Sequence, residues 1–272
     1  MATTVSVIDA PLGAAEFREI SAVVRDVAGI QLPPGKEGLV RARLAKRLRA
    51  HGVASYREYL ELVRDPRGQE LVEMVDVLTT NKTDFFREPA HFDFLVEELP
   101  TLGTLGGGPL RIWSAGCSSG EEPYTLAMVL REHAEGRALQ DARILATDLS
   151  HRVLAQAKAG VYGDAVLAPV PADLKRRHFV RTERGWEANA GLKSLITFGK
   201  LNLMGRWPMR GPFQAIFCRN VMIYFDRATQ QTLVRRYYDL LAPGGYLFVG
   251  HSESLSALQH DFAYVRPAVY RK

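Results

Sequence analysis

From residue 110 onward, short apolar runs alternate with segments that carry a helical pattern. The runs are LRIWS at 110–114, RILATD at 143–148, FQAIFC at 213–218 and YLFVG at 246–250, and helices are expected at 121–134, 150–159 and 227–241. Strands that alternate with helices in this way build a parallel sheet with crossover helices. This pattern therefore predicts an α/β domain, and in such open sheets ligands bind at the carboxyl ends of the strands.

The first hundred residues show helical periodicity and no alternation typical of strands. The expected helices span 16–28, 39–50, about 55–64, 69–78 and about 89–99. Ser55 and Glu58 form a candidate capping box for the third of these helices, and Pro89 suits the first turn of the fifth. We expect an all-α N-terminal domain at 1–88, followed by the α/β domain at 89–272.

The alternation breaks between residues 160 and 203. The stretch RHFVRTERGWEAN at 177–189 predicts a β-hairpin that turns near Arg184 and Gly185. LKSLITFGKLNL at 192–203 is a candidate third strand of the same small sheet. We therefore expect an antiparallel β insertion, or β subdomain, at about 161–199 within the α/β domain.

Composition excludes several classes of protein. The chain has two cysteines, which makes a disulfide framework improbable, and its seven histidines show no metal-ligand spacing, so no metal site is expected. No apolar run approaches the roughly 20 residues that a membrane span needs, and the N-terminus lacks the features of a signal peptide. We expect a cytoplasmic monomer without membrane insertion. A net charge of +5 only hints at an anionic partner.

The stretch WSAGCSSGEEPY at 113–124 follows the first apolar run and enters a helix. Gly116 and Gly120 supply a turn in which backbone can approach a ligand closely. A dinucleotide site would place a phosphate at the following helix N-terminus. Glu121 and Glu122 occupy that position, where they would repel a pyrophosphate and favour a cationic ligand. S-adenosylmethionine (AdoMet) carries an ammonium, a sulfonium and no phosphate; a NAD-binding or purely structural domain is the alternative.

Two further segments favour AdoMet. Asp148 ends the second apolar run, where a carboxylate can accept hydrogen bonds from ribose hydroxyls. The stretch LLAPGGYLFVG at 240–250 combines a helix end, a Pro-Gly-Gly turn and a strand, as commonly occurs late in AdoMet-dependent methyltransferases. Arg219 and Asn220 follow the apolar run FQAIFC and are expected at a strand tip over the ligand cleft.

Five motifs together resemble one family. They are TNKTDFFRE at 80–88, SAGCSSGEEPY at 114–124, ATDLS at 146–150, FCRNVMIYFD at 217–226 and GHSES at 250–254. In this order they are similar to the chemotaxis receptor methyltransferases of the CheR type, over nearly the whole chain. The resemblance implies a Rossmann-like methyltransferase domain and an AdoMet site between two domains. It also implies methyl transfer to glutamate side chains of methyl-accepting chemotaxis receptors, with S-adenosylhomocysteine as the product.

The resemblance also implies a set of site residues. The implied cofactor contacts are Asn81, Thr83, Arg87, one of Glu121 and Glu122, Asp148, Asn202, Leu203, Arg219 and Asn220. Arg87 and Tyr224 are the positions implied nearest the reacting methyl group, although Tyr224 is as readily a wall residue as a participant. A glutamate side chain has an ordinary pKa of about 4.3 and is already an anionic nucleophile near pH 7. No catalytic triad and no titrating histidine are therefore expected, and His251 is interpreted as a satisfied histidine near a strand end.

The stretch KEGLVRARLAKRLR at 36–49 carries six basic residues against one acidic residue. Arg43, Lys46 and Arg47 are candidates for substrate docking, because the resemblance implies that this face binds the cytoplasmic helical domain of a receptor. A solvated face is the plain alternative. Nucleic acid is not expected, since aromatic residues are scarce in the stretch and no known module is present.

Three questions stay open at this stage. Some members of the family capture a receptor C-terminal peptide by adding a strand to the β subdomain, whereas the charged strands from Arg181 to Glu187 fit ordinary edge protection equally well. Another substrate class with the same cofactor is the second question. An AdoMet-sensing scaffold without turnover is the third.

Overall fold

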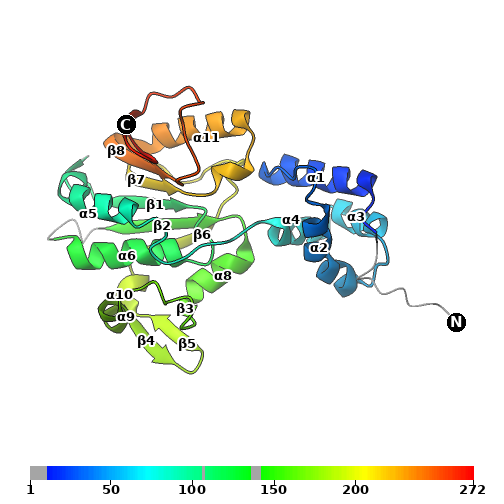
Figure 1. Ribbon diagram of the computed structural model, residues 1–272, viewed down its shortest axis with the longest axis horizontal. Coiled ribbons are helices and arrows are strands. Elements are labelled where there is room, and N and C mark those ends of the chain that lie inside the picture. Colours follow the sequence, from blue (N-terminus) through cyan, green and yellow to red (C-terminus); the bar gives the residue numbers. More distant parts are fainter. Residues whose placement is uncertain (1–10, 106–107, 136–141) are drawn as a thin grey trace. The chain divides into compact units, whose positions relative to one another are not determined.

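A computed structural model describes residues 11–105, 108–135 and 142–272 of the chain. The contacts divide it into two compact units (Figure 1). The first unit contains the residues up to Thr80 together with Tyr224–Asp226, and the second contains Asn81–Ile223 and Arg227–Lys272. Residues 81–88 thus make their contacts in the second unit, and the domain limits 1–88 and 89–272 stay a prediction.

The first unit is built from helices, as its periodicity predicted. They are α1 (Ala14–Ala28), α2 (Glu37–His51), α3 (Tyr56–Arg64) and α4 (Glu70–Leu78). Their apolar faces form one core, which includes Ile20, Leu44 and Tyr59, all with no exposed surface. The Ser55 hydroxyl accepts the Glu58 N–H at 3.2 Å and so caps α3, as expected. The Glu58 carboxylate in turn accepts the N–H of Ala54 rather than that of Ser55.

The second unit contains a seven-stranded sheet in the order β6-β2-β1-β7-β8-β10-β9. Its strands are β1 (Arg111–Ala115), β2 (Arg143–Asp148), β6 (Ile196–Lys200), β7 (Phe213–Cys218), β8 (Leu241–Val249), β9 (Ala263–Arg266) and β10 (Val269–Arg271). The first five in the sheet order run parallel, and β10 and β9 close the sheet as an antiparallel pair. The chain goes to one side of β1 with β2 and β6, and then to the other side with β7 and β8. The topological switch point therefore lies between β1 and β7.

Helices pack on both faces of this sheet. They are α5 (Ala90–Leu102), α6 (Glu121–His133), α8 (His151–Ala159) and α11 (Arg227–Leu240), with the short 3-10 turn η3 (Met222–Tyr224). Successive residues of β1 point to opposite faces. Ile112 joins the core that α5 and α6 cover, whereas the ring of Trp113 meets the ring of Tyr237 on α11 at 5.5 Å. The α/β fold expected from the alternation is confirmed.

A three-stranded antiparallel sheet lies between α8 and β6 in the sequence. It contains β3 (Val161–Tyr162), β4 (Phe179–Thr182) and β5 (Gly185–Ala188) in the order β3-β5-β4, flanked by the short helices α9 (Ala172–His178) and α10 (Ala190–Lys193). The expected hairpin is confirmed, but the assignment of its third strand to 192–203 is wrong. That stretch forms β6, which pairs in parallel with β2 in the large sheet. An apolar strand pattern shows that a segment extends, but not which sheet completes it.

Candidate active site at the strand ends

The glycine turn after β1 is anchored on the end of β2. The N–H groups of Gly116 and Cys117 both donate to the carbonyl of Thr147, at 2.8 and 2.9 Å. Gly116 has a φ of +91°, and a Cβ there would stand 2.4 Å from a methyl group of Val221, in the loop after β7. A Cβ at Gly120 would stand 2.7 Å from the Tyr162 hydroxyl. Only glycine therefore allows this turn to close at the switch point between β1 and β7.

Asp148 is the last residue of β2 and points to the same turn. One of its carboxylate oxygens accepts the N–H of Ser118 and the other accepts the N–H of Ser150, each at 2.9 Å. The residue is 9% exposed. An ionised carboxylate only accepts hydrogen bonds, so Asp148 places an acceptor rather than a donor beside the turn. Its predicted contact with a ribose is consistent with this position and stays a prediction.

The structure separates the two glutamates that the sequence could not rank. Glu121 is held by the hydroxyl of Ser119, and burial raises the pKa of its carboxyl group. Glu122 accepts the Ser114 hydroxyl at 2.6 Å and the guanidinium of Arg219 at 3.0 Å. Glu122 is thus engaged in an internal ion pair, whereas Glu121 binds a hydroxyl group, and which of the two contacts a ligand stays a prediction.

Arg219, directly after β7, joins three segments of the unit. Its guanidinium bonds Glu122 on α6, lies 3.1 Å from the carboxylate of Glu88, and donates to the carbonyl of Arg87. Its side chain is 2% exposed. A contact between Arg219 and a cofactor stays a prediction, but the guanidinium itself is occupied by protein acceptors. Its evident role is to hold residues 87–88 against the start of α6.

Residues 81–88 lie along the glycine turn and α6. The carbonyl of Asn81 accepts the Ser118 hydroxyl at 2.8 Å, and Phe86 donates its N–H to the hydroxyl of Thr125 at 3.2 Å. Phe85 is buried in the core of the unit, with its ring edge-on to that of Tyr162 at 5.0 Å. The side chain of Arg87 donates to the carbonyl of Lys82 at 3.0 Å. The structure therefore brings the predicted residues Asn81 and Arg87 to the strand ends with the turn.

Thr83 lies in the same segment and is half-buried. On the other side of Asp148, the chain leaves β6 through Leu201, whose N–H donates to the carbonyl of Asp148 at 2.9 Å. Asn202 follows and accepts the N–H of Met204 with its side chain, while the carbonyl of Leu203 accepts a bond from Arg236. Asn202 and Leu203 are therefore also at this edge of the sheet, and their cofactor contacts stay predictions.

Backbone strain concentrates in these segments. Among the described non-glycine residues, Phe86, Glu88, Ser118 and Asn220 have φ values between +48° and +58°, and Ala268 is the one outside the site. A left-handed backbone at a non-glycine residue costs free energy and persists where surrounding contacts enforce it. Its presence in three separate segments that meet at one edge of the sheet supports a binding site there.

Glu253 is a site residue that sequence reasoning missed. Its carboxylate accepts the N–H groups of Asn220, Ile223 and Gly250 at 2.8, 3.0 and 2.6 Å, and it is 7% exposed. It thereby fixes the strand-tip loop that carries Asn220. The GHSES motif contains this residue, but only the fold shows that the motif lies next to the end of β7.

Tyr224 lies in a different unit from the predicted site residues at the strand ends. It belongs to the first unit, where its carbonyl accepts the N–H of Gln31 at 2.8 Å. The role of Tyr224 beside Arg87 at the reacting group therefore stays a prediction.

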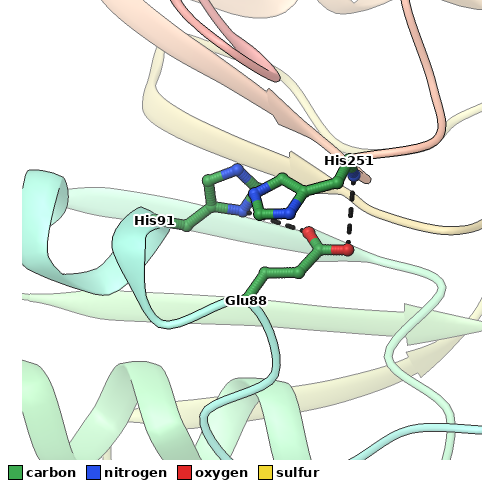
Figure 2. A group of neighbouring side chains, drawn as sticks. All are labelled: Glu88, His91 and His251. Atoms are coloured by element: carbon green, nitrogen blue, oxygen red, sulfur yellow. Dashed lines mark hydrogen bonds and ion pairs between the residues drawn. The ribbon is translucent and has the colours of Figure 1, made fainter.

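His251 is exposed and follows the end of β8. Its backbone N–H donates to Glu88 at 3.3 Å, and its ring lies edge-on to the ring of His91, with centroids 5.0 Å apart (Figure 2). His91, on α5, is 1% exposed, and burial lowers the pKa of its imidazole to about 4. Glu88 and His91 were not singled out from the sequence.

Basic residues of α2 bind more acceptors within the protein than the sequence indicated. Arg43 donates to the carbonyls of Leu78 and Thr79 at the end of α4, at 2.6 and 2.8 Å. Arg47 donates to the carboxylate of Glu70, whose side chain is 5% exposed. Lys46 is exposed. Two of the three predicted docking residues thus bind acceptors within their own unit.

Within the described part of the chain, no helix is both long and apolar enough to cross a membrane. Residues 15–79 match the family model described as CheR methyltransferase, all-alpha domain, and residues 81–270 match CheR methyltransferase, SAM binding domain, in which SAM is AdoMet.

Named relatives agree with the two family models. A probable chemotaxis protein methyltransferase of Rhizobium etli is 42% identical over 253 residues, which cover 90% of this chain and 94% of the relative. Chemotaxis protein methyltransferase 2 of Pseudomonas aeruginosa is 41% identical over 264 residues, which cover 94% and 92%. The chemotaxis protein methyltransferase of Borreliella burgdorferi is 38% identical over 266 residues, which cover 94% of each chain.

Proposed function

The chain belongs to the CheR methyltransferase family, and from that premise we propose that it forms methyl esters on glutamate side chains of chemotaxis receptors, with AdoMet as the methyl donor. The observation that carries this proposal is the carboxylate-rich glycine turn at the switch point of the sheet. Such a turn suits a cationic ligand and disfavours a phosphate.

The residues at the strand ends fit AdoMet. A Cβ at Gly116 would clash with Val221, so the turn closes only with glycine at that position. Asp148 and Glu121 are buried side chains that accept hydrogen bonds, whereas a phosphate needs donors. Asp148 would hold the ribose, and Glu121 would hold the ammonium group. The sulfonium supplies an activated methyl group and a good leaving group.

The remaining work of the protein is positioning. A receptor glutamate is ionised near pH 7 and needs no general base. Arg87 is the residue that we assign to orient this carboxylate, since a guanidinium matches a carboxylate bidentately. Arg219 does not contact the substrate in this proposal. It holds the backbone of Arg87 by donating a hydrogen bond to the Arg87 carbonyl. Exclusion of water and in-line placement supply the rest of the rate enhancement.

Calorimetry with Asp148→Asn tests the cofactor site. Because hydrogen bonds to a charged acceptor contribute about 1.5–3 kcal/mol, the dissociation constant for AdoMet should rise about ten- to hundredfold. Asp261→Asn, an exposed carboxylate on the same unit, should leave it unchanged. Equal affinity in both variants, or stronger binding of NAD than of AdoMet by the unaltered chain, would refute the assignment.

The reaction itself is tested with labelled AdoMet and receptor membranes. We expect label that base releases as methanol, because esters are base-labile and N-methyl groups are not. Base-stable label would favour another substrate class. Stoichiometric AdoMet binding without transfer to any receptor would favour a sensing scaffold.

We propose that the exposed cations of α2 dock on the acidic helical domain of the receptor. Lys46, Arg41 and Arg49 are exposed, whereas Arg43 and Arg47 have protein partners. Lys46→Glu should lower receptor methylation several-fold at low salt and leave AdoMet binding intact. Arg206→Glu, an exposed charge reversal on the other unit, is the matched control. Equal methylation rates in the two variants would remove the docking role.

A receptor peptide tether at the β subdomain remains a second, finer proposal. Strand β4 is an edge of the small sheet, and strand addition pairs the backbone groups of such an edge with those of a peptide. Arg181 on the same strand is paired with Asp164, so it does not block the edge as a free charge. Removing the receptor's C-terminal residues should lower methylation only if this edge is used; unchanged rates would count against the tether.

A further inference from the structure

The end of β8 and the start of α5 bring two histidines and a glutamate together. Glu88 precedes α5, His91 lies in its first turn, and His251 follows β8. Each offers one donor atom, and the three atoms lie within 4.8 Å of one another. In Figure 2 both imidazole rings lie beside the Glu88 carboxylate. The cluster makes no contact with the transferred methyl group in the scheme proposed above, although Glu88 is also a partner of Arg219.

His91 carries the second, independent observation. It is 1% exposed, and among the described residues neither of its ring nitrogens has a hydrogen-bond partner. A buried polar group without a partner costs free energy of folding, so a ligand that binds an imidazole nitrogen would stabilise this site. Nδ1 of His91 lies 3.5 Å from the Glu88 carboxylate, which is too long for a hydrogen bond but suits two ligands of one ion. Its neutral imidazole is the form that binds metals.

We propose that Glu88, His91 and His251 bind a divalent transition ion, with Zn²⁺ as the best match, in a site with three protein ligands and one open position. Two imidazoles and one carboxylate are a donor set that Zn²⁺ accepts, whereas Mg²⁺ and Ca²⁺ prefer oxygen ligands only. Tetrahedral bonds of about 2.0–2.1 Å place ligand atoms about 3.4 Å apart, so three donor atoms that lie within 4.8 Å of one another need only a small side-chain adjustment to share one ion.

The local charge permits a cation here. The guanidinium of Arg219 is near, but it is paired with both Glu88 and Glu122, so two carboxylates face one positive charge before the ion enters. A bound ion would tie the segment that carries Arg87 to the loop that contains Glu253. We therefore expect Zn²⁺ to raise the melting temperature of the full chain.

The test is a Zn²⁺ titration of the chelator-treated full chain in competition with a chromophoric chelator. The unaltered chain should bind one equivalent, and Co²⁺ in its place should give the intense visible bands of a tetrahedral site. His251→Ala and His91→Phe should each weaken binding at least about tenfold, since even outer-shell changes cost 10–100-fold. His133→Ala, an exposed histidine on α6, should bind as the unaltered chain does.

His251→Ala keeps the test decisive if His91→Phe unfolds, because His251 is exposed and its removal leaves the core intact. Cys117 and Cys218 are buried and do not compete for the ion in the folded chain. Absence of stoichiometric Zn²⁺ binding, or equal affinity in His251→Ala and His133→Ala, would overturn the proposal. Unchanged binding in the presence of excess Mg²⁺ is expected, and displacement by Mg²⁺ would contradict the assigned ligand chemistry.

Discussion

Arg47 in the helical unit and Arg219 in the α/β unit invite a direct comparison. The sequence marked both as contacts for a partner or a ligand, and in the structure both bind carboxylates of their own unit. The side chain of Arg47 is 23% exposed and that of Arg219 is 2% exposed. The two arginines thus form the same kind of pair in very different surroundings.

The surroundings decide what each pair does. Arg47 joins α2 to α4 through Glu70, which also accepts bonds from Tyr59 and His51. Arg219 joins three segments and is the cation shared by Glu88 and Glu122. Loss of Arg47 leaves the carboxylate of Glu70 with its other partners. Loss of Arg219 leaves the poorly hydrated carboxylates of Glu88 and Glu122 without their shared cation. We therefore expect burial and the number of dependent partners to decide how much each ion pair contributes to stability.

Arg219→Ala should give the largest effect. Breaking a buried pair by removing one partner costs about 3–5 kcal/mol, because the remaining charge stays in the interior. Urea unfolding followed by circular dichroism should show this loss, and methyl transfer should fall with it because residues 87–88 lose their anchor. Arg206→Ala, an exposed arginine of the same unit, should change stability by less than about 0.5 kcal/mol. Similar stability of the two variants would end the distinction drawn here.

Arg47→Ala should have a smaller effect. Loss of a hydrogen-bonded charge partner costs about 1–3 kcal/mol, and partial exposure places this site toward the lower end of that range. The same urea experiment should show little change for Lys46→Ala, its exposed neighbour on α2. A loss for Arg47→Ala as large as that for Arg219→Ala would show that burial does not separate the two pairs.

The pH dependence of stability should reveal the smallest effect. Burial alone would raise the pKa of Glu70, but its hydrogen bonds, led by that from Arg47, hold the pKa below its ordinary value. The stability that Glu70 contributes is therefore present above the unfolded pKa of about 4.3 and is lost as the pH falls through the lower folded value. Glu70→Gln should lose less stability than the unaltered chain between pH 5 and pH 3 in urea titrations. Parallel curves for the two proteins would show that Glu70 is not stabilised by its ionisation.

Local patterns predicted much of the fold. The helices around Leu44 and Val24, the strands that end at Asp148 and Cys218, and the hairpin at Gly185 all follow from periodicity, capping and turn residues. These signals act over a few residues, so a linear reading captures them. The glycine turn followed by two glutamates likewise indicated a cationic ligand, because the charge at a helix N-terminus can be read from neighbouring residues.

The sequence by itself therefore determined the helices of the first unit, the strands β1, β2, β7 and β8 with the helices between them, and the chemistry of the turn after β1, but not the elements α9, α10, β9 and β10. Only the tertiary structure decided that β6 completes the large sheet, that Arg47 and Arg219 bind carboxylates, and that His91 meets His251. Each of these outcomes joins residues that are far apart in the chain. A side chain bonds whichever partner the fold brings within reach at the lowest cost of burial, and that choice depends on three-dimensional proximity, which no local pattern records.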